Sequence, residues 1–289
     1  MSHIKRSRIA EIRAQILDGI EISEQQFPQV GLVSNRNMSF ICTGTLVSDV
    51  HVLFAAHCTP TILNDTDGIF QVRGIQFSSK KITIHPDYNE ARIGYDDAND
   101  LAIMELEASP NLPAAALLNQ APQTGDEMVI VGFGLGGSGE EVAGTAGIKR
   151  MGVTYAETIS DNRIIWQYDI GEANTALGDS GGPAFIDGAV AAVTSGGSDP
   201  NVYGSTSFST RVDVYLDWIR SIIHFQTAEV LEVGFDCEYE DAHGATQTKK
   251  VTWKEFMPNC PVNGINCSGE PAMVAATTVC NQQLWTETT

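Results

Sequence analysis

The chain has 289 residues, of which 43% are hydrophobic and 18% charged, and its formal net charge is −19. This length and apolar fraction can bury one large core or two medium ones, which excludes a disordered or coiled-coil chain. The acidity disfavours nucleic acid and anionic lipid as partners, because both would be repelled. No apolar run reaches about 18 residues, so no segment is expected to span a membrane.

Residues 1–15 differ from the rest of the chain in charge. They hold four basic side chains and one acidic one, whereas the whole chain has 36 acidic residues against 17 basic ones. Such a start resembles the first part of a signal peptide, but no apolar stretch comes after it. Either a signal has already been removed or none exists, and residues 1–15 form a segment of a different kind from residues 16–289.

Short apolar runs separated by Gly, Pro, Asn and Asp fill residues 16–210. They lie at 45–47, 52–56, 82–84, 101–106, 128–131 and 189–193. Repeated runs of strand length with turn residues between them predict an antiparallel barrel or sandwich.

Two glycine motifs within this region point to other folds. Residues 132–137 fit G-x-G-x-x-G after an apolar run, but no helix pattern opens there, so we expect a flexible loop and disfavour a nucleotide-dependent oxidoreductase. Residues 178–182 fit the G-x-S-x-G turn of α/β-hydrolases. That fold needs alternating strands and helices with a suitably placed later histidine, and the sequence offers neither.

The pattern changes towards the C-terminus. Apolar residues between Val212 and Ile223 recur at helical spacing and predict one helix that ends near Phe225. Residues 231–240 then alternate strictly between apolar and polar, which predicts a half-buried strand. A turn at 241–244 and a second strand through Trp253 come next. We expect a small cysteine-stapled β module that begins near Thr227.

The six cysteines form two groups. Cys42 and Cys58 lie sixteen positions apart, and the other four, Cys237, Cys260, Cys267 and Cys280, cluster near the C-terminus. An even number without a C-x-x-C pair favours disulfides over a zinc site. Disulfides in turn predict an oxidising location, either extracellular or periplasmic.

Three residues suit nucleophilic catalysis, in the order His57, Asp100 and Ser180. The histidine ends an apolar run, the aspartate precedes one, and the serine lies in a glycine-rich turn. A serine hydroxyl is a weak nucleophile at neutral pH, so it needs an adjacent base. That base needs a carboxylate to hold its tautomer and stabilise its charged form. Singly, they could also be a core histidine, a turn-capping aspartate and a structural serine.

Together these segments resemble those of the trypsin-like (chymotrypsin-fold) serine peptidases, over roughly residues 16–225. The matching stretches read AAHC at 55–58, NDLAIMEL at 99–106 and GDSGGP at 178–183. The resemblance implies an all-β fold of two antiparallel β-barrels with a C-terminal helix, and the Cys-rich β extension would come after it. It also implies a Cys42–Cys58 disulfide that pins the loop presenting His57.

The resemblance assigns a role to each candidate. Ser180 would be the nucleophile, His57 the general base and then acid, and Asp100 the orienting carboxylate. The backbone N–H groups of Gly178 and Ser180 would form the oxyanion hole. No cofactor or metal is implied, and the substrates would be proteins or peptides. The alternative is a proteolytically silent binding protein on the same fold.

The resemblance also implies activation by cleavage. Residues 1–15 would be a propeptide, 16–227 the peptidase domain and 228–289 a Cys-rich extension. The freed amine of Ile16 would pair with Asp179 and shape the oxyanion hole. Gln15 stands where the family usually has Arg or Lys, so either a different protease cuts here or trimming follows a cut after Arg13. Alternatively, residues 1–15 are a tail that is never removed.

The substrate pocket departs from that of trypsin. The resemblance implies that Asn174 takes the place of the aspartate at the pocket floor, with Thr175 beside it and Ser207 on the opposite wall. A substrate cation would lack its partner there, so we expect a neutral, polar pocket with weak preference for Arg or Lys. Ser195 and Gly197 would lie on the strand that pairs with substrate backbone. Gly196 between them replaces the family's usual aromatic residue, and Ala176 replaces a cysteine.

The extension at 228–289 has no assigned role. It could bind a partner, support export, inhibit the site or act as a passive cap. Asn37, Asn64 and Asn266 fit glycosylation acceptor motifs, which matter only in a glycosylating host.

Overall fold

The computed structural model describes residues 16–61, 65–135, 146–169, 171–198, 203–223, 227–240 and 246–258. The chain divides into two compact units, Met1–Gln226 and Thr227–Thr289. The expected propeptide, Asn64, Asn266, Cys260, Cys267, Cys280 and the turn at 241–244 lie outside the described residues.

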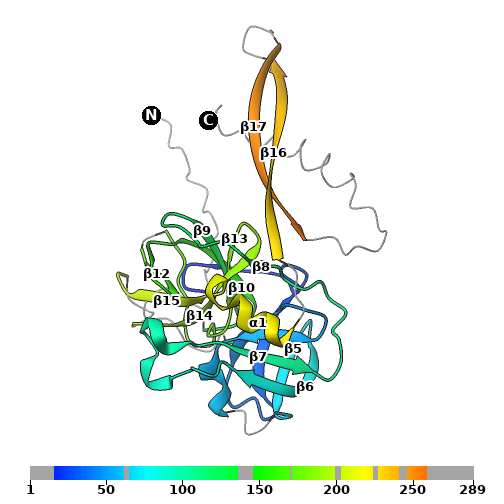
Figure 1. The fold of residues 1–289 in the computed structure, drawn as a ribbon, viewed down its shortest axis with the longest axis vertical. Coiled ribbons are helices and arrows are strands. Elements are labelled where there is room, and N and C mark those ends of the chain that lie inside the picture. The colour runs from blue at the N-terminus through cyan, green and yellow to red at the C-terminus, as the bar shows by residue number, and fades with distance from the viewer. Residues whose placement is uncertain are drawn as a thin grey trace, which may run out of the picture. The chain divides into compact units, whose positions relative to one another are not determined.

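The first sheet closes into a barrel (Figure 1, blue to cyan). Its strands run in the order β2-β3-β4-β7-β6-β5, and pairing between β2 and β5 completes the ring. They are β2 (Val30–Asn35), β3 (Cys42–Leu46), β4 (His51–Phe54), β5 (Gly68–Val72), β6 (Ile75–Ile84) and β7 (Ala102–Leu106). The predicted runs at 45–47, 52–56, 82–84 and 101–106 fall on β3, β4, β6 and β7.

The second sheet is antiparallel along the path β1-β10-β9-β13-β14-β15-β12-β11. Its members are β1 (Ile20–Glu21), β9 (Glu127–Gly132), β10 (Arg150–Tyr155), β11 (Thr158–Ile159), β12 (Arg163–Gln167), β13 (Pro183–Ile186), β14 (Ala189–Gly197) and β15 (Thr206–Arg211). A short strand, β8 (Leu117–Leu118), pairs in parallel with β14. The predicted all-β architecture of two antiparallel β-barrels is confirmed as two antiparallel sheets, of which the first closes into a barrel.

A single apolar cluster joins the two sheets. It includes Phe54 and Met104 from the first barrel and Val131 and Phe185 from the second sheet, all at most 3% exposed. Each such side chain contributes about 1.5–3 kcal/mol when it leaves water. The packing of this cluster therefore fixes the two sheets against each other and positions the residues at their junction.

The predicted C-terminal helix is confirmed, although it ends a little earlier than expected. A 3₁₀ turn, η4 (Asp213–Tyr215), leads into α1 (Leu216–Ile222). Tyr215, Ile219 and Ile223 are buried in the common core, as their helical spacing predicts. Three further 3₁₀ turns are η1 (Ala56–Thr61), η2 (Glu90–Arg92) and η3 (Asp96–Ala98). No helix in the described ranges is long and apolar enough to cross a membrane.

The second unit contains an antiparallel hairpin of β16 (Thr227–Glu240) and β17 (Thr246–Pro258). Its register runs from Ala228 opposite Pro258 to Glu240 opposite Thr246. Both strands predicted in the extension are thus present, and the first begins at Thr227, ahead of the predicted start at residue 231.

Candidate active site

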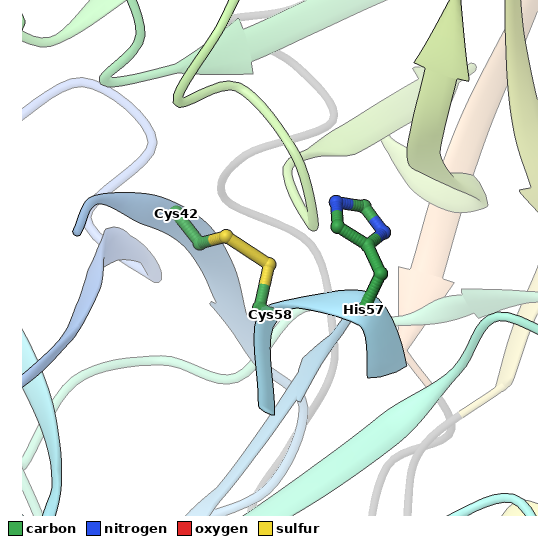
Figure 2. Close-up of side chains that lie close together, drawn as sticks. All are labelled: Cys42, His57 and Cys58. Atoms are coloured by element: carbon green, nitrogen blue, oxygen red, sulfur yellow. A yellow bond between two sulfur atoms is a disulfide. The ribbon is translucent and has the colours of Figure 1, made fainter. Parts of the chain in front are cut away.

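His57 lies in η1, the turn that directly follows strand β4. The next residue, Cys58, forms a disulfide with Cys42 of β3, as the resemblance implies (Figure 2). The disulfide fixes the turn to the barrel, while the imidazole stands beside it, half-buried with 20% of its side chain exposed. This histidine is therefore presented at a fixed place rather than sealed in the core.

Asp100 holds the imidazole in one orientation. Its Oδ1 accepts the backbone N–H of His57 at 2.8 Å, and its Oδ2 lies 2.7 Å from His57 Nδ1. The carboxylate is fully buried, so it needs these partners to be tolerated. A proton on Nδ1 satisfies the contact with Oδ2 and leaves Nε2 free to accept another proton.

Ser195 binds the same carboxylate oxygen as the imidazole. Its hydroxyl donates to Asp100 Oδ2 at 2.5 Å, so His57, Asp100 and Ser195 are hydrogen-bonded in the manner of a catalytic triad. Ser195 is buried and contacts the carboxylate rather than the imidazole, so its hydroxyl is not placed to give its proton to Nε2. The sequence predicts only a substrate-pairing strand here, because no local pattern signals this side-chain contact.

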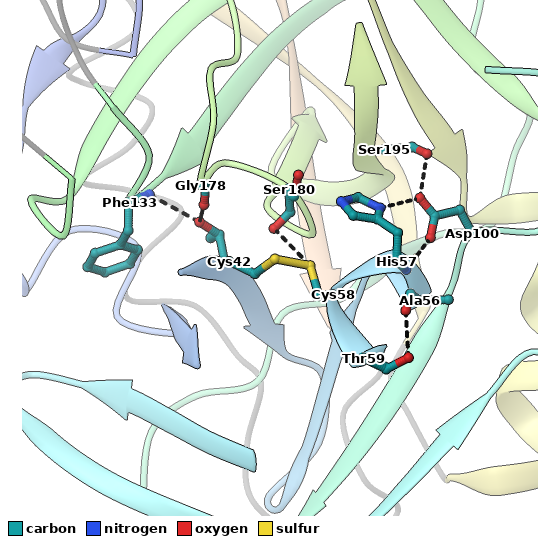
Figure 3. Close-up of a disulfide and its surroundings, with 11 residues drawn as sticks. Cys42, Ala56, His57, Cys58, Thr59, Asp100, Phe133, Gly178, Ser180 and Ser195 are labelled. Carbon is teal, nitrogen blue, oxygen red and sulfur yellow. Dashed lines mark hydrogen bonds and ion pairs between the residues drawn. A yellow bond between two sulfur atoms is a disulfide. The ribbon is translucent and has the colours of Figure 1, made fainter. Parts of the chain in front are cut away.

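Ser180 lies between the disulfide and the imidazole of His57 in Figure 3. Its carbonyl oxygen accepts the N–H of Thr43 at 2.8 Å and lies 3.8 Å from Cys58 Sγ. Thr43 Oγ1 also donates to the carbonyl of Gly178 at 3.0 Å. These bonds tie the serine loop to the strand that carries the disulfide.

The Ser180 hydroxyl and the His57 imidazole, the proposed nucleophile and base, are not yet hydrogen-bonded in this structure. No hydrogen bond joins Ser180 Oγ to the imidazole among the residues described, and such bonds are often long before a substrate binds. Gly178 has a φ of 102°, a conformation that favours glycine.

Asp179 is the buried anchor of the same loop. Its carboxylate accepts the N–H groups of Gly134 at 2.8 Å and Ala176 at 2.9 Å. Burial raises its pKa to about 6, although both hydrogen bonds and the nearby charge of Arg150 oppose the rise. Ile16 is also buried, yet in the described part of the chain no hydrogen bond or ion pair joins it to Asp179.

Two glycines of the G-x-G-x-x-G motif make room for this carboxylate. A Cβ on Gly132 would overlap Asp179 Oδ1, and a Cβ on Gly134 would lie 2.6 Å from Asp179 Cγ. The first two glycines of the motif are therefore packing positions beside the serine loop. The part of the predicted flexible loop from residue 136 lies outside the described residues.

Arg150 binds the other side of Gly134. Its guanidinium is almost fully buried, donates to the carbonyl oxygens of Gly134 at 2.9 Å and Ile148 at 3.2 Å, and lies 3.6 Å from Glu21 Oε1. Gly134 is thus held through its C=O by Arg150 and through its N–H by Asp179. Sequence analysis did not single out Arg150, because only the folded chain brings it to the loop.

The residues predicted for the pocket floor come together. Asn174 is fully buried, and its Oδ1 accepts the Ser207 hydroxyl at 2.5 Å. Thr175 Oγ1 lies 3.3 Å from Ser207 Oγ, and Asn174 Nδ2 lies 3.4 Å from Ser205 Oγ, a residue not predicted. Gly197 pairs with Ser207 across β14 and β15. These side chains carry no charge, and their polar groups bind one another.

Cys42, His57 and Cys58 are also close enough to consider as a metal site, since their potential ligand atoms lie within 4.8 Å of one another. Cysteine ligates a metal as a thiolate, and both sulfurs here are joined in the disulfide. In this oxidised form the cluster does not offer a set of metal ligands.

Comparisons with known proteins agree on one family. A family model described as Trypsin matches residues 16–219. The chain is 28% identical to a trypsin of Phaedon cochleariae over 212 residues, 64% of this chain and 80% of that protein. It is 28% identical to kallikrein-8 of Mus musculus over 226 residues, 72% of this chain and 86% of that protein.

A solved structure gives the same result. Neuropsin, a serine protease expressed in the limbic system of mouse brain, superposes with a TM-score of 0.62 at 25% identity. The match covers 71% of this chain and 98% of neuropsin.

Proposed function

Because this chain belongs to the trypsin family and is a serine endopeptidase, we propose that it hydrolyses peptide bonds with Ser180 as nucleophile, His57 as general base and acid, and Asp100 as orienting carboxylate. The observation that carries the proposal is the double contact of Asp100 with His57, at 2.8 Å to the backbone N–H and 2.7 Å to Nδ1. With Nδ1 engaged, Nε2 is the only ring nitrogen available to take a proton.

The reaction proceeds from these positions. Ser180 Oγ attacks the substrate carbonyl carbon while its proton moves to His57 Nε2, and Asp100 stabilises the resulting imidazolium. The C–N bond then breaks as the imidazolium gives its proton to the leaving amine, which yields an acyl-enzyme. Water then attacks the acyl carbon and gives a proton to His57 Nε2. The ester bond to Ser180 breaks as the imidazolium returns that proton to Ser180 Oγ, and the acid is released.

The oxyanion of each tetrahedral intermediate would be bound by the N–H groups of Gly178 and Ser180. Among the described residues neither group donates a hydrogen bond, although the N–H groups of Asp179 and Gly181, their neighbours, both do. Two unengaged donors beside the nucleophile support this assignment. In serine peptidases one oxyanion donor is worth about 3–4 kcal/mol of transition-state stabilisation.

Activation by cleavage before Ile16 is part of the proposal, with residues 1–15 as propeptide and an activating protease that either accepts Gln15 or acts after a cut at Arg13. Asp179 supports it, because a buried carboxylate with a raised pKa would gain from a nearby ammonium. N-terminal sequencing of the active enzyme tests this step, and a start other than Ile16 would refute it.

For the pocket we propose a neutral, polar site with weak preference for Arg or Lys, formed by Asn174, Thr175 and Ser207 against Ser195 and Gly197. The hydroxyl of Ser207 donates a hydrogen bond to Asn174 Oδ1, so this amide oxygen is already occupied. That contact supports the proposal. The disulfide supports an oxidising, extracellular or periplasmic location. The domain limits at 16–227 and 228–289, and a partner for the extension, remain parts of the proposal.

A serine-directed fluorophosphonate probe tests the catalytic assignment. We expect one label on Ser180 in the processed protein, located by peptide mass spectrometry, and none in Ser180→Ala. Ser195→Ala is the matched control, because it removes a hydroxyl that binds Asp100 rather than the imidazole and should keep the label. An unlabelled Ser180 in processed protein would favour the silent binding protein instead.

A further inference from the structure

Phe208 lies directly opposite Gly196 in the antiparallel pair of β15 and β14. Residues directly opposite each other in such a pair share one face of the sheet. A Cβ on Gly196 would lie 3.0 Å from Phe208 Cζ and 3.3 Å from Cε2, so the ring leans over the glycine. Aromatic side chains that cover a cross-strand glycine are a known way to fill such a gap. The ring occupies the space that a side chain at position 196 would use.

The ring is held in place from two further sides. The guanidinium of Arg163, in β12, lies 5.2 Å from the ring centroid, a distance suited to a cation–π contact. Arg163 is itself fixed by Asp96 Oδ1 at 3.0 Å and by the carbonyl of Gly94. A Cβ on Gly94 would lie 3.6 Å from Phe208 Cζ. Phe208 is nevertheless only half-buried, so part of this apolar side chain is held in place and still accessible to a ligand.

The position of this surface relative to the catalytic groups suggests its use. Residues 195–197 are the last three residues of β14, and the first of them, Ser195, donates its hydroxyl to Asp100. A Cβ on Gly197 would lie 3.1 Å from Ser207 Oγ, so this residue faces the pocket floor. Gly196 faces Phe208. The two sides of one strand therefore present two different environments, one polar and one aromatic.

We propose that Phe208 is a specificity-determining residue that binds a large apolar side chain at the second substrate residue before the scissile bond. This rests on the proposed function. A peptide that adds to the strand at 195–197 alternates its side chains between the two faces. The residue before the scissile bond enters the pocket of Asn174, so its predecessor points to the other face, where the ring of Phe208 lies.

Two synthetic peptides test the inference with the processed, full-length enzyme. They share the same residue before the scissile bond and carry Leu or Ser at the position before that. Partial burial of a leucine supplies about 1.4 kcal/mol, which corresponds to a kcat/KM about tenfold higher for the Leu peptide. In Phe208→Ala this ratio should fall close to one, while the Ser peptide is cleaved at nearly the wild-type rate.

Three further variants separate specificity from folding. Phe208→Leu keeps an apolar side chain in the strand and should lower the ratio only in part. Gly196→Phe in the Phe208→Ala background places a ring from the opposite strand in the vacated space and should restore the preference. Tyr155→Ala is the control, because it removes a ring that is 40% exposed at the end of β10 and should leave the ratio unchanged.

The outcomes distinguish this inference from the proposed function. Hydrolysis without a preference for Leu, or a preference that survives in Phe208→Ala, overturns the inference alone. If neither peptide is cleaved and Ser180 takes no label, the proposed function fails and the inference with it.

Discussion

Replacing Gly132 with alanine would test how the serine loop is held. The added Cβ would overlap Asp179 Oδ1 and lie 2.8 Å from Asp179 Cγ, so the carboxylate must move. Gly132 is not among the glycines with positive φ, so the backbone itself accepts alanine. Overpacking costs about 1–3 kcal/mol. Losing the charged hydrogen bond from Gly134 N–H adds about 1.5–3 kcal/mol. We expect the free energy of unfolding to fall by about 3–5 kcal/mol, a size reserved for a few mechanisms of this kind.

Urea unfolding measures the change in stability, and kcat/KM with fluorophosphonate labelling measures the effect on the loop. We expect activity to fall sharply, because Asp179 adjoins Ser180. Gly125→Ala is the matched control. Its φ is 92° and a Cβ there would meet nothing within 4 Å, so it should cost about 1–2 kcal/mol through the backbone alone and leave activity intact.

A double-mutant cycle isolates the contact. In an Asp179→Ala background the cost of Gly132→Ala should largely disappear, because the overlapping carboxylate is gone. If Gly132→Ala is instead fully active and within about 1 kcal/mol of wild type, at the small end of overpacking costs, Asp179 does not pack here as described.

Three other predictions concern the same region. Ser195→Ala removes a hydrogen bond to the Asp100 carboxylate, worth about 1.5–3 kcal/mol, so kcat/KM should fall about 10- to 100-fold while Ser180 still takes the fluorophosphonate label; complete loss of label would contradict this. Replacing both Cys42 and Cys58 with alanine opens a loop with a sequence separation of 16 and should lower the free energy of unfolding by about 3 kcal/mol, and an unchanged urea midpoint would refute it. In the uncut chain the pKa of Asp179 is raised from 3.8 to about 6, so the folded state binds this proton more tightly and stability should be lost as the pH rises through about 6. Asp179→Asn should remove that part of the pH dependence, and identical stability profiles of the two proteins would rule it out.

The sequence predicts the parts of this protein whose signal is local. The strands around His57 and Asp100 show as short apolar runs, and the helix shows as a spacing of apolar residues from Val212 to Ile223. The pocket candidates Asn174 and Ser207 come from the family resemblance, which implies a floor residue and a residue on the opposite wall at these positions.

What the sequence could not predict depends on contacts between distant residues. Ser195 meets Asp100 across 95 positions, and Gly134 meets Asp179 across 45. The ring of Phe208 covers Gly196 only because β14 and β15 pair in one particular register. Glycines in a sequence can mark a flexible loop or positions where another group packs too closely for a side chain, and the sequence alone does not distinguish the two. Gly132 and Gly134 are of the second kind, because the Asp179 carboxylate packs against them.

Leu17, near the start of the described chain, is hydrogen-bonded to Asn174, the proposed floor of the substrate pocket. Leu17 N–H donates to the carbonyl of Asn174 at 3.1 Å, and Asn174 N–H donates to the carbonyl of Leu17 at 3.0 Å. Thermodynamic coupling between two sites is reciprocal. If loosening the chain at Leu17 lowers the affinity of the proposed pocket at Asn174, an occupied pocket will by the same factor protect that end of the chain from exchange and proteolysis.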